Sequence, residues 1–70
     1  PFKDFIQFQL ADNINDFHIS IFDILGKRLS EKQITKQEPH LSVNNLTPGI
    51  YIMRVDLNGE SSSFKIVKSR

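Results

Sequence analysis

Apolar and polar residues alternate along most of the chain, in short runs separated by residues that favour turns. The clearest run covers residues 50–57, which are rich in β-branched and aromatic side chains and meet no strand-breaking residue before Asn58-Gly59. With a period of two, every second residue from Tyr51 to Leu57 lies on one face, and that face is apolar apart from the tyrosine hydroxyl. The other face is half apolar. This pattern is typical of a central strand.

A tight turn is predicted immediately before this strand. Pro48 fixes φ near the value needed at the second position of a β-turn, and Gly49 accepts the positive φ needed at the third position of a type II turn. Residues 47–50 are therefore expected to reverse the chain in a type II turn.

Other stretches have the pattern of shorter strands. Residues 5–10 and 17–22 alternate, and they are close enough in sequence to form a hairpin with each other. Residues 27–34 carry many charges, which indicates an edge strand. A short strand is expected at residues 40–43. A last strand, completed by residues 64–68, is expected to pair with the central one.

Two more turns can be read from the sequence. Asp23 and Gly26 occupy the first and fourth positions of a type I turn. Gly26 is expected to be left-handed and to leave a bulge where the chain enters the next strand. Asn58-Gly59 is the strongest two-residue hairpin signal in the chain.

Six or seven short strands with no helical period predict an all-β fold, an antiparallel β-sandwich. Seventy residues correspond to a single domain, residues 1–70. The abrupt start at Pro1-Phe2 suggests a fragment from the C-terminal end of a longer protein. The predicted core consists of the inward apolar positions: Ile6, Phe8, Leu10, Phe17, Ile19, Ile21, Leu29, Leu41, Val43, Leu46, Tyr51, Met53, Val55, Leu57, Phe64 and Ile66.

Composition and motifs argue against several functions. The net charge is +1, with both signs spread along the chain, so no nucleic-acid partner is expected. The apolar runs are too short to span a membrane. His18 and His40 have no carboxylate at a metal-site spacing, and there is no nucleophile motif or phosphate-binding loop. We therefore expect no enzymatic activity, no metal, no cofactor and no small-molecule substrate.

Two features exceed what the fold needs. Phe5, Phe22, Ile50 and Ile52 lie on faces opposite the predicted core, where they could form a binding patch or be covered by a neighbouring domain or by loops. The last strand has a basic tip. Composition alone favours a solvated strand end whose lysines discourage unwanted pairing.

Three segments together resemble a known family. They are Asp23-Ile24-Leu25-Gly26-Lys27, Leu46-Thr47-Pro48-Gly49-Ile50-Tyr51 and Phe64-Lys65-Ile66-Val67-Lys68. In this order and spacing they look like the sequence motifs of the type A C-terminal sorting domain, the export signal of the type IX (Por) secretion system of Bacteroidetes-type bacteria. Pro1-Phe2 looks like the end of the family's opening Asn-Pro motif. Ser69 and Arg70 run slightly past the lysine near which family members often stop.

The resemblance implies a non-catalytic, immunoglobulin-like β-sandwich at the C-terminus of a larger cargo protein. In the periplasm the type IX translocon and its shuttle components would recognise it. A sortase-like peptidase would usually remove it, with the cargo then attached to the cell surface or released. Carried over from the family, the motif and turn residues are Pro1, Asp23, Gly26, Leu46, Pro48, Gly49 and Tyr51, and those of the sorting signal are Lys65, Ile66, Val67 and Lys68.

The main alternative is an immunoglobulin-like adhesive or interaction module of a surface protein. Its aromatic contacts would be Phe5, Phe22 and Tyr51. Such a module need not end its polypeptide, whereas a sorting domain must. An exposed terminal strand also allows weak self-association through its free edge.

Overall fold

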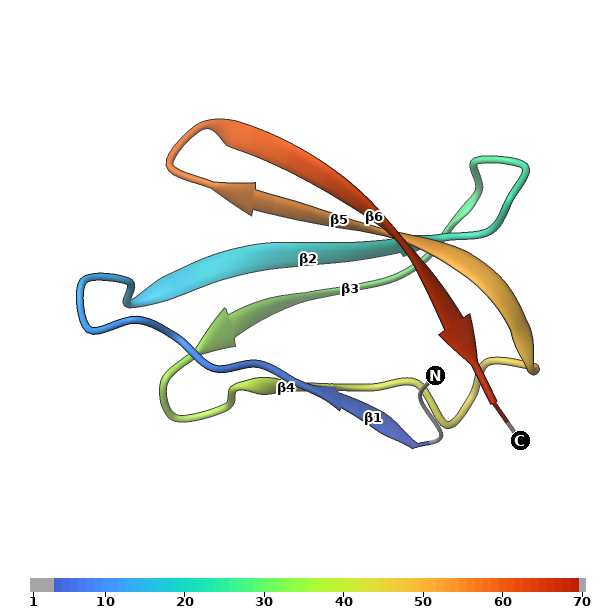
Figure 1. Ribbon diagram of the computed structural model, residues 1–70, viewed down its shortest axis with the longest axis horizontal. Coiled ribbons are helices and arrows are strands. Elements are labelled where there is room, and N and C mark those ends of the chain that lie inside the picture. The colour runs from blue at the N-terminus through green and yellow to red at the C-terminus, as the bar shows by residue number, and fades with distance from the viewer. Residues whose placement is uncertain (1–3, 70) are drawn as a thin grey trace.

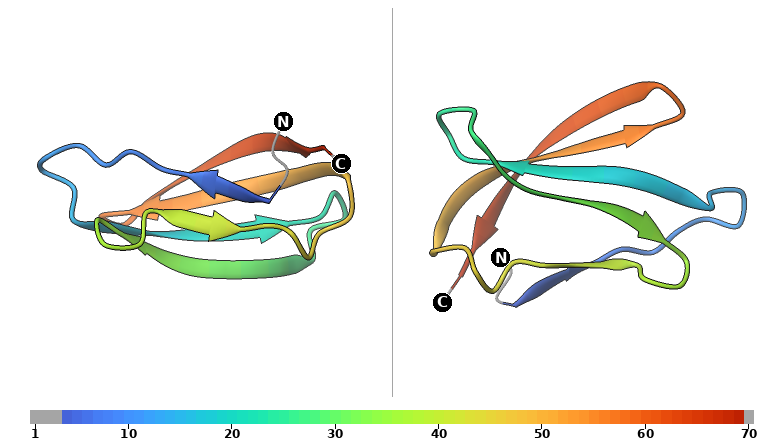
Figure 2. Two further views of the ribbon diagram at one scale, coloured as in Figure 1. Left: turned by 90° about the horizontal axis from the view of Figure 1, so that it is seen from below. Right: turned by 180° about the vertical axis from the view of Figure 1, so that it is seen from behind.

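The computed structural model describes residues 4–69, which form two antiparallel β-sheets packed as a sandwich (Figures 1 and 2). The larger sheet has the strand order β3-β2-β5-β6, and the smaller one pairs β1 with β4. The predicted all-β sandwich is confirmed. No helix in the described part is long and apolar enough to cross a membrane. The strands are β1 (Phe5–Gln7), β2 (Asp16–Phe22), β3 (Arg28–Thr35), β4 (His40–Ser42), β5 (Gly49–Leu57) and β6 (Glu60–Lys68).

Strand β5 is central, as predicted. It pairs on one side with β2, from His18 opposite Asp56 to Phe22 opposite Ile52, and on the other side with β6. The β5–β6 hairpin turns through Asn58-Gly59 alone, because Leu57 pairs with Glu60. Positive φ at both Asn58 (53°) and Gly59 (81°) confirms the predicted two-residue turn. Strand β3 is at the sheet edge, also as predicted.

The predicted hairpin between the first two strands is wrong. Strand β1 pairs with β4 in the other sheet, with Ile6 opposite Leu41, and Phe8 N extends this ladder by donating to Pro39 O at 2.7 Å. Each of the first two strands has one apolar face. Placing those faces in opposite layers buries both, whereas a hairpin would leave them side by side on one sheet. The rings of Phe8 and Phe17 meet edge to face, with centroids 5.5 Å apart.

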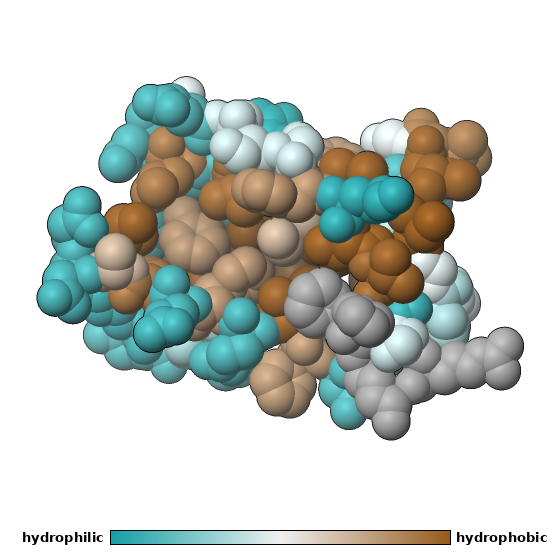
Figure 3. Space-filling model, viewed as in Figure 1, coloured by the Kyte–Doolittle hydropathy of each residue, from teal (hydrophilic) through white to brown (hydrophobic). Residues whose placement is uncertain are grey.

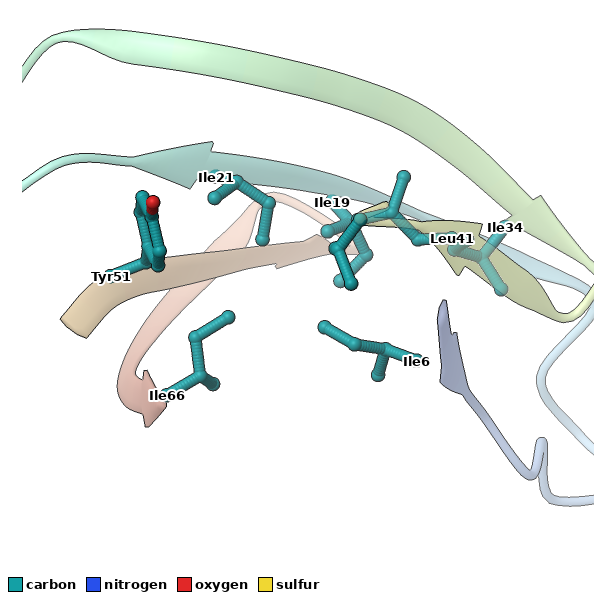
Figure 4. Close-up of a cluster of buried hydrophobic side chains, with 8 residues drawn as sticks. Ile6, Ile19, Ile21, Ile34, Leu41, Tyr51 and Ile66 are labelled. Carbon is teal, nitrogen blue, oxygen red and sulfur yellow. The ribbon is translucent and has the colours of Figure 1, made fainter. Parts of the chain in front are cut away.

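The core lies between the two sheets, where side chains from all six strands converge (Figure 4). Most of the predicted core positions are confirmed. The buried residues among them are Ile6, Ile19, Ile21, Leu41, Val43, Tyr51 and Ile66, and packed against these are the partly buried Phe8, Leu10, Phe17, Leu29, Leu46, Met53 and Val55.

The sequence missed Ile34, which is completely buried. Its pairing partner Phe17 places it on the inner face of β3. The cause is a bulge: the register between β2 and β3 shifts so that Ile21 pairs with Ser30 while Phe22 pairs with Arg28. The extra residue exchanges the two faces of the strand. Counting in twos from Leu29 therefore puts Ile34 on the wrong side.

Two predicted core residues lie outside the core. Phe64 faces inward opposite Met53 but is 52% exposed, and Leu57 is only half-buried. Each strand of the small sheet is only three residues long, and this sheet does not extend over the β5–β6 hairpin. There the inner face is an open hollow of about 350 Å³, lined by Val55, Leu57, Asn58, Glu60, Ser62 and Phe64. Figure 3 shows apolar surface, in brown, across the middle of the molecule on this side.

Candidate functional site

The motif residues around Asp23 form the hairpin turn between β2 and β3. Gly26 N donates to Asp23 O at 3.1 Å, and Gly26 has φ +91°, so the predicted turn and its left-handed glycine are confirmed. One carboxylate oxygen of Asp23 accepts two further hydrogen bonds, from Leu25 N and Lys27 N, both at 2.9 Å. The Asp23 side chain thus stabilises the loop by accepting hydrogen bonds from backbone amides along it.

The predicted type II turn at residues 47–50 is wrong. Gly49 has φ +157°, far from the value of about +80° that such a turn requires. Gly49 already belongs to β5, where it pairs with Lys68, so its backbone must be extended. The chain reverses a step earlier, at Asn44-Asn45, where Leu46 N donates to Val43 O at 3.1 Å.

Tyr51, rather than a type II turn, binds the carbonyl of Thr47 and fixes the segment before β5. Its ring is buried, and its hydroxyl donates to Thr47 O and lies 3.1 Å from Thr47 Oγ1. The carbonyl that a type II turn would have bonded to an amide is therefore satisfied by a side chain from the core. This arrangement is similar to the tyrosine corner of immunoglobulin-type sandwiches. The buried ring also rules out Tyr51 as an exposed aromatic contact of an adhesive module.

The four residues of the predicted sorting signal lie on β6, which is the other edge of the large sheet. Their side chains alternate between the faces. Ile66 points inward opposite Tyr51 and is 8% exposed, and Lys68 lies on the same side at the strand end. Lys65 and Val67 are exposed on the outer face. These four side chains therefore do not form one surface.

The three motif segments meet at one end of the sandwich (Figure 1). The β2–β3 hairpin, the start of β5 and the end of β6 all lie there, since Phe22 pairs with Ile52 and Ile50 with Val67. Pro1 and Phe2, with the proposed Asn-Pro remnant, and Arg70 are outside the described residues.

Apolar side chains gather on the outer face at this end, of which Ile50 and Val67 are exposed and Phe22 and Ile52 are half-buried. One row across the sheet reads Arg28, Phe22, Ile52 and Lys65, because each pairs with the next. The adjacent row pairs Ile50, 49% exposed, with Val67, 44% exposed. Phe22, Ile50, Ile52, Lys65 and Val67 are called the outer-face patch below.

The remaining half of the outer face is polar, and its charged side chains pair with one another. Arg54 Nε bonds Asp56 Oδ1 at 3.0 Å, and Ser61 donates to the same oxygen. The Ser61 hydrogen bond lowers the pKa of Asp56 against a smaller opposing effect of desolvation, and the hydrogen bond and charge of Arg54 lower it further. His18 Nε2 lies 3.1 Å from Glu31, which also binds Arg28. Within residues 4–69 no group of three or more potential ligands could hold a metal.

The sequence reading overlooked the exposed tip of the β2–β3 hairpin. Ile24 is 74% and Leu25 is 90% exposed, the most of any large apolar residues described. Two consecutive apolar residues inside a turn between Asp23 and Gly26 are the signal that could have revealed it, since turn positions project into solvent. Phe5, by contrast, was correctly expected to face outward. It is 54% exposed and meets His40 edge to face with centroids 6.2 Å apart.

The model of the secretion system C-terminal sorting domain matches residues 1–69 of this chain. The chain belongs to this family. No match was found among curated proteins or among solved structures. The sorting domain is a C-terminal signal of type IX secretion, a system that exports its substrates across the outer membrane to the cell surface or the medium. The domain therefore acts through the secretion machinery, and the family is one of secretion signals rather than of enzymes.

Proposed function

We propose that the type IX machinery recognises this domain in its folded state, mainly through the free edge and outward side chains of β6. The domain ends a larger cargo protein, enters the periplasm with it, and is engaged there by translocon and shuttle components. A sortase-like peptidase then removes it, and the cargo is attached to the cell surface or released.

The observation that carries this proposal is the position of β6 in the sheet. Along all nine residues, from Glu60 to Lys68, one side of the strand is bonded to β5. The other side faces no strand among those described. Free N–H and C=O groups on an edge strand can bind an extended segment of a partner by strand addition, with side chains setting specificity.

The alternation along β6 gives its residues different tasks. Ile66 is buried against Tyr51 and anchors the strand to the core. Lys65 and Val67 project outward, where a partner can contact them, and Lys68 extends the inner face at the strand end. The turn residues Asp23, Gly26, Leu46, Pro48 and Gly49, together with Tyr51, support this presentation without contacting the partner.

The test is a reporter export assay. A periplasmic fluorescent protein carrying this chain at its C-terminus is expressed in a bacterium with a working type IX system, beside a fusion that ends before Lys65. We expect surface or medium fluorescence only from the first. If the complete, folded domain stays in the periplasm, the proposal fails.

A second test separates recognition from folding. Reversing both charges in a Lys65→Glu, Lys68→Glu variant should reduce export, while the unfolding midpoint of the purified domain stays close to that of the original chain because neither side chain is buried. Unaltered export would contradict a role for these lysines.

A further inference from the structure

We infer that the machinery contacts the outer-face patch as well as the strand edge, through a protein surface that is apolar and presents a carboxylate to Lys65. This inference rests on the proposed function and names the partner surface for the same strand. The patch combines residues from β2, β5 and β6, so it exists only in the folded domain.

Exposure and location distinguish this patch from the rest of the sheet. Ile50 and Val67 pair across β5 and β6 and are each close to half exposed. The inner face of the same strands packs on the core through Tyr51 and Ile66, whereas no described element covers the outer face. A contiguous apolar area of this kind on a small domain is typical of a protein-binding surface.

The charge pattern indicates what the partner carries. Arg28 and Arg54, the other cations of this face, are matched by Glu31 and Asp56 at 3.3 Å and 3.0 Å. None of the ion pairs among residues 4–69 includes Lys65. The patch therefore offers one unmatched positive charge beside apolar side chains. A complementary surface places a carboxylate there, since opposite charges across an interface favour association and like charges oppose it.

Strand addition and the patch are compatible with one partner. A segment added to the free edge of β6 would continue the outer face and place alternate side chains beside Lys65 and Val67. The preferred segment carries an acidic residue next to Lys65 and an apolar residue next to Val67. Lys68, on the opposite face, takes no part in this contact.

The test uses the export fusion with matched variants. Lys65 and Lys68 carry the same charge on the same strand but on opposite faces, so Lys65→Glu should lower export about tenfold or more, the equivalent of one strong contact, and clearly more than Lys68→Glu does. Lys65→Arg should retain export and Lys65→Met should lose it. Val67→Thr keeps the β-branched shape and removes apolar surface, so it should also reduce export, whereas Val67→Ile should not.

Each outcome is informative. All variants are purified and checked for an unchanged unfolding midpoint, so that loss of export reports on contact. Failure of the original fusion to be exported would count against the proposed function itself. Normal export of the original together with Lys65→Glu and Val67→Thr would overturn the patch while leaving the proposed function intact. Equal damage from Lys68→Glu would mean that the charge of the strand tip matters, not the outer face, and would also overturn it.

Discussion

The hydroxyl of Tyr51 makes a contribution to stability that can be isolated by one substitution. In a Tyr51→Phe variant the ring still fills its buried place, but Thr47 O loses its hydrogen-bond donor. A net hydrogen bond contributes about 0.5–1.5 kcal/mol, and the partly buried carbonyl left without a partner moves the loss towards the upper value. We therefore expect a loss of about 1–1.5 kcal/mol. In a domain of this size, each kcal/mol corresponds to a Tm shift of about 4–8 °C.

The assay is thermal unfolding of the purified chain, followed by far-ultraviolet circular dichroism and repeated in urea. Thr47→Val serves as the matched control, because it removes only Thr47 Oγ1 and leaves the carbonyl in place. It should cost less than Tyr51→Phe, and the double variant should show coupling between the two positions. An unchanged Tm in Tyr51→Phe would refute the view that this hydroxyl closes the segment before β5.

Three further changes test the fold. Ile34→Ala opens a cavity at a completely buried position and should cost about 2–5 kcal/mol, enough to unfold much of a small domain, as measured by urea denaturation. Asp23→Ala removes two hydrogen bonds from one loop and should cost about 1–2 kcal/mol in the same assay, whereas Asp23→Asn, which keeps the acceptor, should cost less. Because the pKa of Asp56 is lowered in the folded state, its contribution is present above its ordinary pKa of 3.8 and is lost as the pH falls through the folded value. Ser61→Ala should therefore flatten the decline in Tm on acidification, and an unchanged acid profile would contradict the Ser61–Asp56 contact.

Local chemistry predicted the strands and two of the three turns well. Gly26 and Asn58-Gly59 were read correctly because their turns are determined by backbone preferences of a few adjacent residues. The edge position of β3 also followed from its charges. The alternating faces of β6 followed directly from the period of two.

Errors arose wherever the outcome depended on residues far apart in the sequence. The partner of β1 is decided by which layer can bury Ile6. A bulge was predicted where the chain enters β3, but the local pattern did not indicate which residue it displaces, and its position between Arg28 and Ser30 turns Ile34 inward. Phe64 is exposed because the other sheet ends short of it. Pro48-Gly49 is a strong turn signal, yet pairing of Gly49 with Lys68 extends the backbone there.

The candidate site was only partly accessible from the sequence. The resemblance points to residues 65–68 as one signal, but their side chains alternate between the two faces of the strand. Ile66 is buried in the core. The outer-face patch includes Phe22 from a strand distant in sequence, and no local pattern indicates that it lies in the same row as Lys65.

The pairing of β1 with β4 has a consequence for how the molecule opens. The hairpins β2–β3 and β5–β6 close over short loops, whereas β1 must find a partner more than thirty residues away, with only three pairs along the ladder. The pairing of β2 with β5 spans a similar sequence separation but is held by five residue pairs, so the three-pair contact of β1 with β4 offsets its loop-closure entropy least and is expected late in folding. The small sheet should therefore detach as a unit while the four-stranded sheet persists. In native-state hydrogen exchange, the amides of Phe8 and Val43 should exchange earlier than those of β2 and β5.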